Sequence, residues 1–131
     1  MIVAIDHLVM TITDLEKTKT FYCDGLGMRF ESFTPAQGGA PRHALVFGAQ
    51  KINLHDASNP HPPHAAQPNP GGIDVCFLTD QSLDGWQDHL AAQHIPIEAG
   101  PVARTGATGP IESLYLRDPD GNLVEIAVQT A

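Results

Sequence analysis

The stretch that decides the fold is "RDPDGNLVEI", residues 117–126, near the end of the chain. Its first half is typical of a turn between two strands, with Gly121 where a positive φ is needed. Its second half begins the apolar strand "LVEIAV", in which Glu125 is the one charged side chain. Strand alternation puts Glu125 on the face opposite to its neighbours Val124 and Ile126. Glu125 therefore either faces water from a half-buried strand or points inward with a chemical role.

The composition is that of an acidic globular chain. Its 131 residues are enough for one domain, and 42% are hydrophobic and 17% charged. The 15 acidic residues outnumber the 7 Lys and Arg, which gives a formal net charge of -8. No basic cluster is present, so the sequence argues against binding to nucleic acid or to an anionic membrane surface.

The ends and cysteines of the chain suggest a cytoplasmic location. The first residues, "MIVAIDHLVMTI", are typical of a strand rather than of a signal peptide. No window approaches the roughly 20 apolar residues that span a bilayer. Cys23 and Cys76 are too few for a disulfide framework and lack a CxxC spacing, so we expect two small buried apolar residues.

A proline-rich segment, residues 56–72, separates two halves with the same plan. It holds five of the 11 prolines, which disfavours regular structure there. Each half is predicted to be β-α-β-β-β, with Asp14 and Ser82 as the helix N-caps. The predicted strands are 4–12, 28–33, 43–47 and 51–56, then 73–80, 95–102, 112–118 and 122–128, and the predicted helices are 15–27 and 83–94.

These halves are predicted to share one core. Neither is large enough to be comfortable alone, so we expect them to pair about a pseudo-twofold axis. The prediction is a single α+β domain over residues 1–131. Its first module covers 1–57, its proline-rich linker 58–70 and its second module 71–131.

Four strand positions carry side chains that can bind a metal. His7 and Asp74 lie in the first strands of the two halves, and His55 and Glu125 lie in the last strands. Inward groups from equivalent strands converge if the halves pair about a twofold axis. Imidazoles and carboxylates together suit Zn, Mn, Fe, Co or Ni. Taken singly, each is more often a solvated, satisfied or edge residue than a ligand, so the prediction depends on their combination.

The opening "DHLVMTITDLEKTKTFYCDGLGM" (6–28) and the ending "YLRDPDGNLVEI" (115–126), together with the repeated plan, resemble the vicinal oxygen chelate superfamily. This superfamily includes glyoxalase I, fosfomycin-modifying enzymes, extradiol dioxygenases, methylmalonyl-CoA epimerase and bleomycin-binding proteins. The resemblance covers essentially the whole chain. It implies a curled eight-stranded mixed sheet, a cup, around one divalent metal ion.

The resemblance also implies a ligand set. His7 matches the family's first-strand histidine and Glu125 its terminal-strand glutamate. Two positions depart from the pattern: Asp74 stands where the family has His or Gln, and Asn53 stands where glyoxalases have Glu. His55, two residues after Asn53, is a ligand, a general base titrating near neutral pH, or a polar strand end. Either Asp74 or His55 is therefore expected to complete a metal site begun by His7 and Glu125.

A substrate region is predicted around the second half. The glycine-rich stretch "GPVARTGATGP", residues 100–110, is predicted to be a mobile loop over the cup. Its Arg104 is either an anchor for a substrate carboxylate or phosphate, or a solvated loop residue. Tyr115 and Phe47 are the predicted lining residues of the cavity.

Three functions are compatible with these features. The favoured one is a metal-dependent lyase or isomerase of the glyoxalase I type, in which the ion stabilises charge on two adjacent substrate oxygens and Glu125, His55 or Asp74 acts as the base. The alternatives are a metal-free protein that binds a drug or another small molecule, and an extradiol dioxygenase-like enzyme with His7, His55 and Glu125 around Fe(II) or Mn(II). In each case we expect a homodimer, because an open cup leaves sheet edges to cover.

Overall fold

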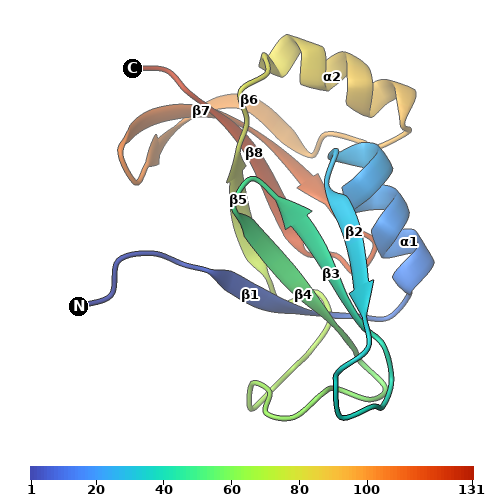
Figure 1. Ribbon diagram of the computed structural model, residues 1–131. Helices are drawn as coiled ribbons and strands as arrows, with labels where there is room; N and C mark the ends of the chain where they lie inside the picture. Colours follow the sequence, from blue (N-terminus) through green and yellow to red (C-terminus); the bar gives the residue numbers. More distant parts are fainter. The chain divides into compact units, whose positions relative to one another are not determined.

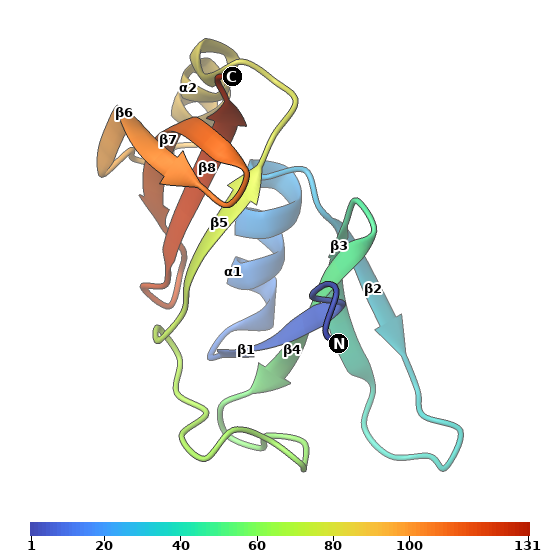
Figure 2. The same cartoon turned by 90° about the vertical axis from the view of Figure 1, so that its left-hand side faces the viewer.

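The computed structural model describes residues 1–131 and divides them into two compact units, 1–71 and 72–131. Each unit contains one four-stranded mixed sheet and one helical segment, in the order β-α-β-β-β (Figures 1 and 2). The predicted α+β fold of two βαβββ modules is therefore confirmed, and the eight strands form two sheets of four.

The first unit is built around a sheet of order β1-β4-β3-β2. Strands β1 and β4 are parallel, and the other pairs are antiparallel. The elements are β1 (His7–Ile12), α1 (Leu15–Lys19), the π-helical turn η1 (Thr20–Gly25), β2 (Arg29–Phe33), β3 (Arg42–Phe47) and β4 (Gln50–Asp56).

The second unit repeats this arrangement with the sheet order β5-β8-β7-β6. Strands β5 and β8 are parallel, like β1 and β4. The elements are β5 (Asp74–Leu78), α2 (Leu83–Ala92), β6 (Ala99–Gly106), β7 (Gly109–Arg117) and β8 (Leu123–Gln129).

Both helices begin where the sequence places their caps. The Asp14 carboxylate accepts a hydrogen bond from the Lys17 backbone N–H at 2.9 Å, and the Ser82 hydroxyl accepts one from Gly85 N–H at 3.1 Å. The first helix changes to a π-helical turn after Lys19, a change that the sequence pattern does not indicate. It ends where Gly27 adopts a φ of 79°, as expected for a glycine stop.

The turn before β8 is held by Asp118 and Asn122. The Asp118 carboxylate accepts hydrogen bonds from Asp120 N–H, Asn122 N–H and the Asn122 side-chain amide, at 2.8–3.0 Å. The Asn122 side-chain oxygen accepts the N–H of Ile73 at 2.9 Å, which fastens the turn to the start of β5. Gly121 has a φ of 88°, as the sequence predicts. This network fixes the point from which β8 and Glu125 start.

The stretch 100–110 is not a mobile loop, and that prediction is wrong. Residues Ala99–Gly106 form β6 and pair with β7, with a register shift between Ala99 and Val102. Only Ala107 and Thr108 connect the two strands. The glycines serve close approach and the tight connection: a Cβ on Gly100 would lie 2.3 Å from the Ser113 carbonyl oxygen.

The predictions for the linker are confirmed, and those for the cysteines are confirmed only in part. Residues 57–73 contain no helix or strand, in agreement with the proline content. Both cysteines are free thiols, as predicted. The prediction that both are buried is wrong, because Cys23 is only half-buried and Cys76 is exposed. Neither helix is long and apolar enough to cross a lipid bilayer.

Replacing Asn122 by Ala should lower the free energy of unfolding by about 2–4 kcal/mol. Asn122 is fully buried, and its loss leaves the Ile73 N–H and one Asp118 oxygen without these partners. Chemical denaturation measures the change. The exposed linker residue Asn69 is the matched control, and equal effects of Asn122→Ala and Asn69→Ala would contradict the role given to the turn.

Candidate functional site

The strand register places Glu125 on one defined face of the second sheet. Glu125 lies opposite Cys76 of β5 and Tyr115 of β7. Its neighbours Val124 and Ile126 occupy the other face and are at most 2% exposed. We call the face that carries Glu125 the Glu125 face. The sequence correctly predicted that the carboxylate is separated from the apolar core residues of its own strand.

Glu125 is held by a neighbour that the sequence did not single out as functional. The hydroxyl of Ser113, a fully buried residue of β7, donates to Glu125 Oε2 at 2.5 Å. On the other side, burial and then the charge of Glu125 raise the pKa of the Cys76 thiol to about 11. Cys76 is therefore a neutral thiol beside Glu125 at physiological pH. A serine two residues from Tyr115 on β7 was the available signal, because period-two alternation puts both on one face.

Three further predicted residues share the Glu125 face. Asp74 is two residues before Cys76 on β5, so it lies one diagonal step from Glu125. The Tyr115 hydroxyl accepts a hydrogen bond from Arg104 Nε at 3.0 Å, and the Arg104 guanidinium lies 5.4 Å from the Tyr115 ring centroid. The structure thus brings Asp74, Arg104 and Tyr115 together around Glu125.

In the first unit, His7 starts β1 and is oriented by its neighbour in sequence. His7 Nδ1 donates to the Asp6 carboxylate at 2.8 Å, and the side chain is 43% exposed. With Nδ1 protonated in this contact, Nε2 is the nitrogen available to a ligand. A carboxylate on the outer nitrogen is the usual arrangement around a metal-bound histidine.

The register of β1 and β4 separates His7 from His55. His7 lies opposite Lys51, whereas His55 lies opposite Thr11, four residues further along β1. At about 3.3 Å per residue, the two imidazoles start about 13 Å apart along the strands. Both donor atoms of one metal site must lie within about 2.1 Å of the ion. Because side chains on one face stand roughly parallel, this spacing argues against a metal ion shared by His7 and His55.

The same registers show which residues are equivalent in the two units. Asp74 begins β5 as His7 begins β1, and Glu125 lies opposite the third residue of β5 as Asn53 lies opposite the third residue of β1. Asn53 is therefore the counterpart of Glu125. The first unit offers an amide where the second offers a carboxylate.

Phe47 lies on the opposite face of the first sheet from His7 and Asn53. It pairs with Gln50, whereas Ala44 pairs with Asn53, so alternation puts Phe47 with Leu45 and His43. His43 stacks on Phe30 at 5.4 Å, and Phe30 also contacts Lys19 of α1. This is the helix side of the sheet, so the structure does not bring Phe47 to the predicted ligands.

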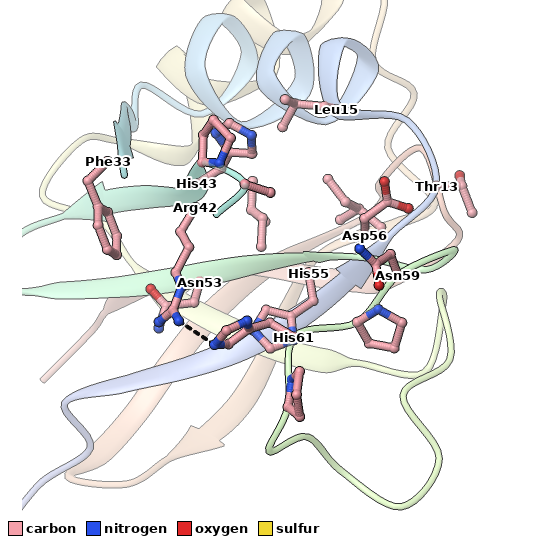
Figure 3. A pocket seen from close by; sticks show the side chains of 16 residues that line it. Thr13, Leu15, Phe33, Arg42, His43, Asn53, His55, Asp56, Asn59 and His61 are labelled. Atoms are coloured by element: carbon pink, nitrogen blue, oxygen red, sulfur yellow. Dashed lines mark hydrogen bonds between the residues drawn. The ribbon is translucent and has the colours of Figure 1, made fainter. Parts of the chain in front are cut away.

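His55 lines a cavity within the first unit (Figure 3). Its ring lies 6.2 Å from the ring of His61 in an edge-to-face arrangement, and its Nδ1 is buried without a hydrogen-bond partner. Burial, followed by the nearby His61, His64 and Arg42, holds the pKa of His55 below its ordinary value of 6.5. The sequence missed this cluster because His61 and His64 come from the linker.

The donor atoms of the candidate metal ligands are of the types that bind a divalent ion. His7 offers an imidazole nitrogen, Glu125 keeps Oε1 apart from the Ser113 contact, and Asp74 is exposed. One imidazole and two carboxylates suit the borderline divalent metals. No group of three or more His, Cys, Asp or Glu side chains is arranged to hold a metal in the structure.

An NMR titration of the imidazole resonances should place the midpoint of His55 below 6.5. Because the pKa of His55 is lower in the folded than in the unfolded state, the free energy of unfolding should fall as the pH drops from 6.5 toward the folded-state pKa. His61→Gln should move the midpoint upward, because the nearby His61 ring is one of the causes that hold the pKa of His55 down, and His89→Gln, on α2, should not. A midpoint at or above 6.5 in the unsubstituted protein would contradict the half-buried position of this ring.

Comparisons with known proteins agree with this architecture. The model of the Glyoxalase/Bleomycin resistance protein/Dioxygenase superfamily matches residues 4–126. The chain is 48% identical to virulence protein STM3117 of Salmonella typhimurium over 123 residues, which cover 94% of this chain and 82% of that protein. It is 47% identical to the glyoxalase domain-containing protein RDO1 of Mycosarcoma maydis over 124 residues, covering 95% of this chain and 67% of that protein.

Solved structures extend the comparison. An integron cassette protein from V. cholerae has a TM-score of 0.92 and 46% identity, and covers 99% of this chain and 98% of its own. A lactoylglutathione lyase from Agrobacterium tumefaciens has a TM-score of 0.65 and 29% identity, covering 95% of this chain and 92% of its own. TnmS3, an antibiotic binding protein from Streptomyces, shares the fold with a TM-score of 0.74 and 19% identity over 99% of each chain. The chain therefore belongs to the Glyoxalase/Bleomycin resistance protein/Dioxygenase superfamily.

Proposed function

We propose that the protein is a divalent-metal-dependent lyase or isomerase of the glyoxalase type, acting on a small substrate that presents two adjacent oxygens. The observation that carries the proposal is the position of Glu125. It stands on the sheet face opposite to Val124 and Ile126, with Oε2 fixed by the buried Ser113 and Tyr115 directly across from it. A carboxylate that only faced water would need no buried hydroxyl to orient it.

The ligand set that we propose is His7, Glu125 and Asp74. Superfamily members commonly bind a divalent metal ion, and these three residues supply the donor types that such an ion prefers. His55 is left out, because the β1–β4 register separates it from His7. Asn53, the counterpart of Glu125, leaves the set with three protein ligands and open positions for substrate.

When bound, the ion would supply Lewis acidity to the two substrate oxygens. The protein side chains then have three tasks. Glu125 accepts the proton from the carbon beside the carbonyl through the carboxylate oxygen that does not bind the ion, with Asp74 as the alternative base on the same face. Ser113 donates to Oε2 and so fixes the orientation of the carboxylate. Tyr115 and Arg104 hold the oxygenated end of the substrate, since Arg104 uses Nε and Nη1 internally and retains Nη2.

The glyoxalase reading is supported by the family and by the 29% identity to a lactoylglutathione lyase. A glutathione hemithioacetal is therefore the first substrate to test. Within the family, segments 47–57, 68–80 and 96–122 most resemble glyoxalase domain-containing protein 5, and this resemblance supports the same group of reactions. The homodimer and the cytoplasmic location remain predictions from the sequence.

The two competing functions are affected differently by the geometry. The hypothesis of a dioxygenase-like enzyme needs His55 as a second imidazole beside His7. The β1–β4 register argues against it, because it separates the two residues along the strands. The hypothesis of a metal-free binding protein is favoured by Asn53. This residue stands at the position equivalent to Glu125, and its amide oxygen is a weaker metal ligand than a carboxylate. The superfamily includes small-molecule binders, so this reading is the one that the metal measurement must decide.

His7→Ala and Glu125→Ala should each abolish retention of a divalent metal in protein purified without added metal, while leaving the fold intact. Each change removes one of the proposed ligands. Elemental analysis measures the metal content and circular dichroism the fold. His89→Ala, on α2 and outside the proposed ligand set, is the control and should keep the metal. Full occupancy in either alanine variant would remove that residue from the site.

Enzyme assays distinguish the remaining functional hypotheses. A methylglyoxal–glutathione assay should show turnover that depends on the metal and is lost in Glu125→Gln, because the amide cannot accept the proton. A catechol oxygen-uptake assay should show no reaction. Metal-free protein as isolated, with no turnover after metal addition, would instead indicate the binding function.

A further inference from the structure

The strongest unexplained feature is the cavity in the first unit that contains His55. Its volume is about 570 Å³, which is within the range of sites for small organic molecules. It lies between the end of β4, the start of β3 and the linker (Figure 3). Its lining includes Phe33, Arg42, Asn53, His55, Asn59 and His61.

Arg42 provides the charge of this cavity. Its Nη2 donates to Nε2 of His61, and it forms no ion pair with any carboxylate. An arginine without a carboxylate is notable in a chain of net charge -8. Because the charged arginine donates to Nε2, the remaining ring proton of a neutral His61 is on Nδ1 and free to donate.

The one carboxylate in the lining, Asp56, is hydrogen-bonded to Ser58. Asp56 Oδ1 accepts hydrogen bonds from the N–H and the hydroxyl of Ser58, at 2.8 and 2.7 Å. Figure 3 shows its side chain apart from the joined Arg42 and His61. Its charge is therefore not the partner of Arg42.

The rest of the lining supplies donors and an apolar wall. The side-chain amides of Asn53 and Asn59 make no hydrogen bond within the protein, and the buried Nδ1 of His55 has no partner. Phe33 is 48% exposed, and Pro41 and Pro60 also line the cavity. The cavity thus combines an unpaired cation and uncommitted polar groups with an apolar surface.

We propose that this cavity is a binding site for a small organic anion, whose carboxylate or phosphate is held by Arg42 with help from His61 and Asn53, and whose apolar part packs on Phe33. Arginine binds both groups through two parallel hydrogen bonds. The proposed metal ligand His7 does not line the cavity, whereas Asn53 does and lies between the levels of His7 and His55 on the same face of the sheet. The anion site does not rest on the proposed lyase function.

The test uses three matched probes: benzoate, phenyl phosphate and the neutral benzyl alcohol. Titrations of the full-length protein are followed by calorimetry and by NMR of the ring and amide signals of His55, His61 and Asn53. At least one of the two anions should bind and shift these signals, and benzyl alcohol should not. Binding of benzoate alone supports a carboxylate ligand, and binding of phenyl phosphate alone supports a phosphate ligand.

Arg42→Gln should weaken anion binding by about tenfold or more, since a charge-assisted pair is replaced by a neutral amide. Arg29→Gln is the matched control: Arg29 lies on β2 of the same sheet, 3.5 Å from Glu31 and outside the cavity. Its effect should stay within about twofold. Thermal unfolding should show that both variants fold. Equal affinities for Arg42→Gln and Arg29→Gln, binding of the alcohol as tight as that of the anions, or no anion binding would overturn the proposal.

Discussion

The constraint on which the rest of the structure depends is the register of the two parallel strand pairs, β1 with β4 and β5 with β8. A shift of either register by one residue would exchange the two faces of that strand. The observed registers put Val124 and Ile126 with the core and Glu125 with Ser113. The turn network around Asn122 fixes the second register, because it binds the start of β8 to the start of β5. The chemistry assigned to Glu125 follows from that local packing.

Local signals in the sequence were sufficient for much of the fold. The caps at Asp14 and Ser82, the positive φ of Gly121 and the alternation around Glu125 each depend on residues close together in the chain. The shared face of Arg104, Tyr115 and Glu125, by contrast, follows from the pairing of β6, β7 and β8, because the sequence predicted Arg104 to lie in a loop. The full extent of the β6–β7 hairpin was missed because glycine content was interpreted as mobility, whereas Gly100 and Gly106 permit close backbone approach. The π-helical turn after Lys19 lies within the predicted helix, and the sequence pattern does not indicate it.

The missing part of the candidate site depends on pairing between distant segments. Whether His7 stands beside Lys51 or beside His55 is decided by a strand register over more than 40 residues, and no local pattern reports it. The meeting of His55 with His61 likewise depends on the path of a proline-rich linker. The first unit consequently holds two imidazole locations with different surroundings: His7 is exposed beside Asp6, and His55 is part of a cavity with Arg42. Sequence spacing alone merged them into one ligand set.

In the proposed function, one divalent ion takes ligands from both ends of the chain, an imidazole from β1 and a carboxylate from β8. Anomalous diffraction from a crystal grown with Co(II) or Mn(II), recorded on both sides of the metal absorption edge, would locate such an ion. We expect one strong peak bonded to His7 Nε2 and to Glu125, whether the two come from one chain or from two. A peak on His55 without His7, or no peak near Glu125 at full metal loading, would contradict the proposed ligand set.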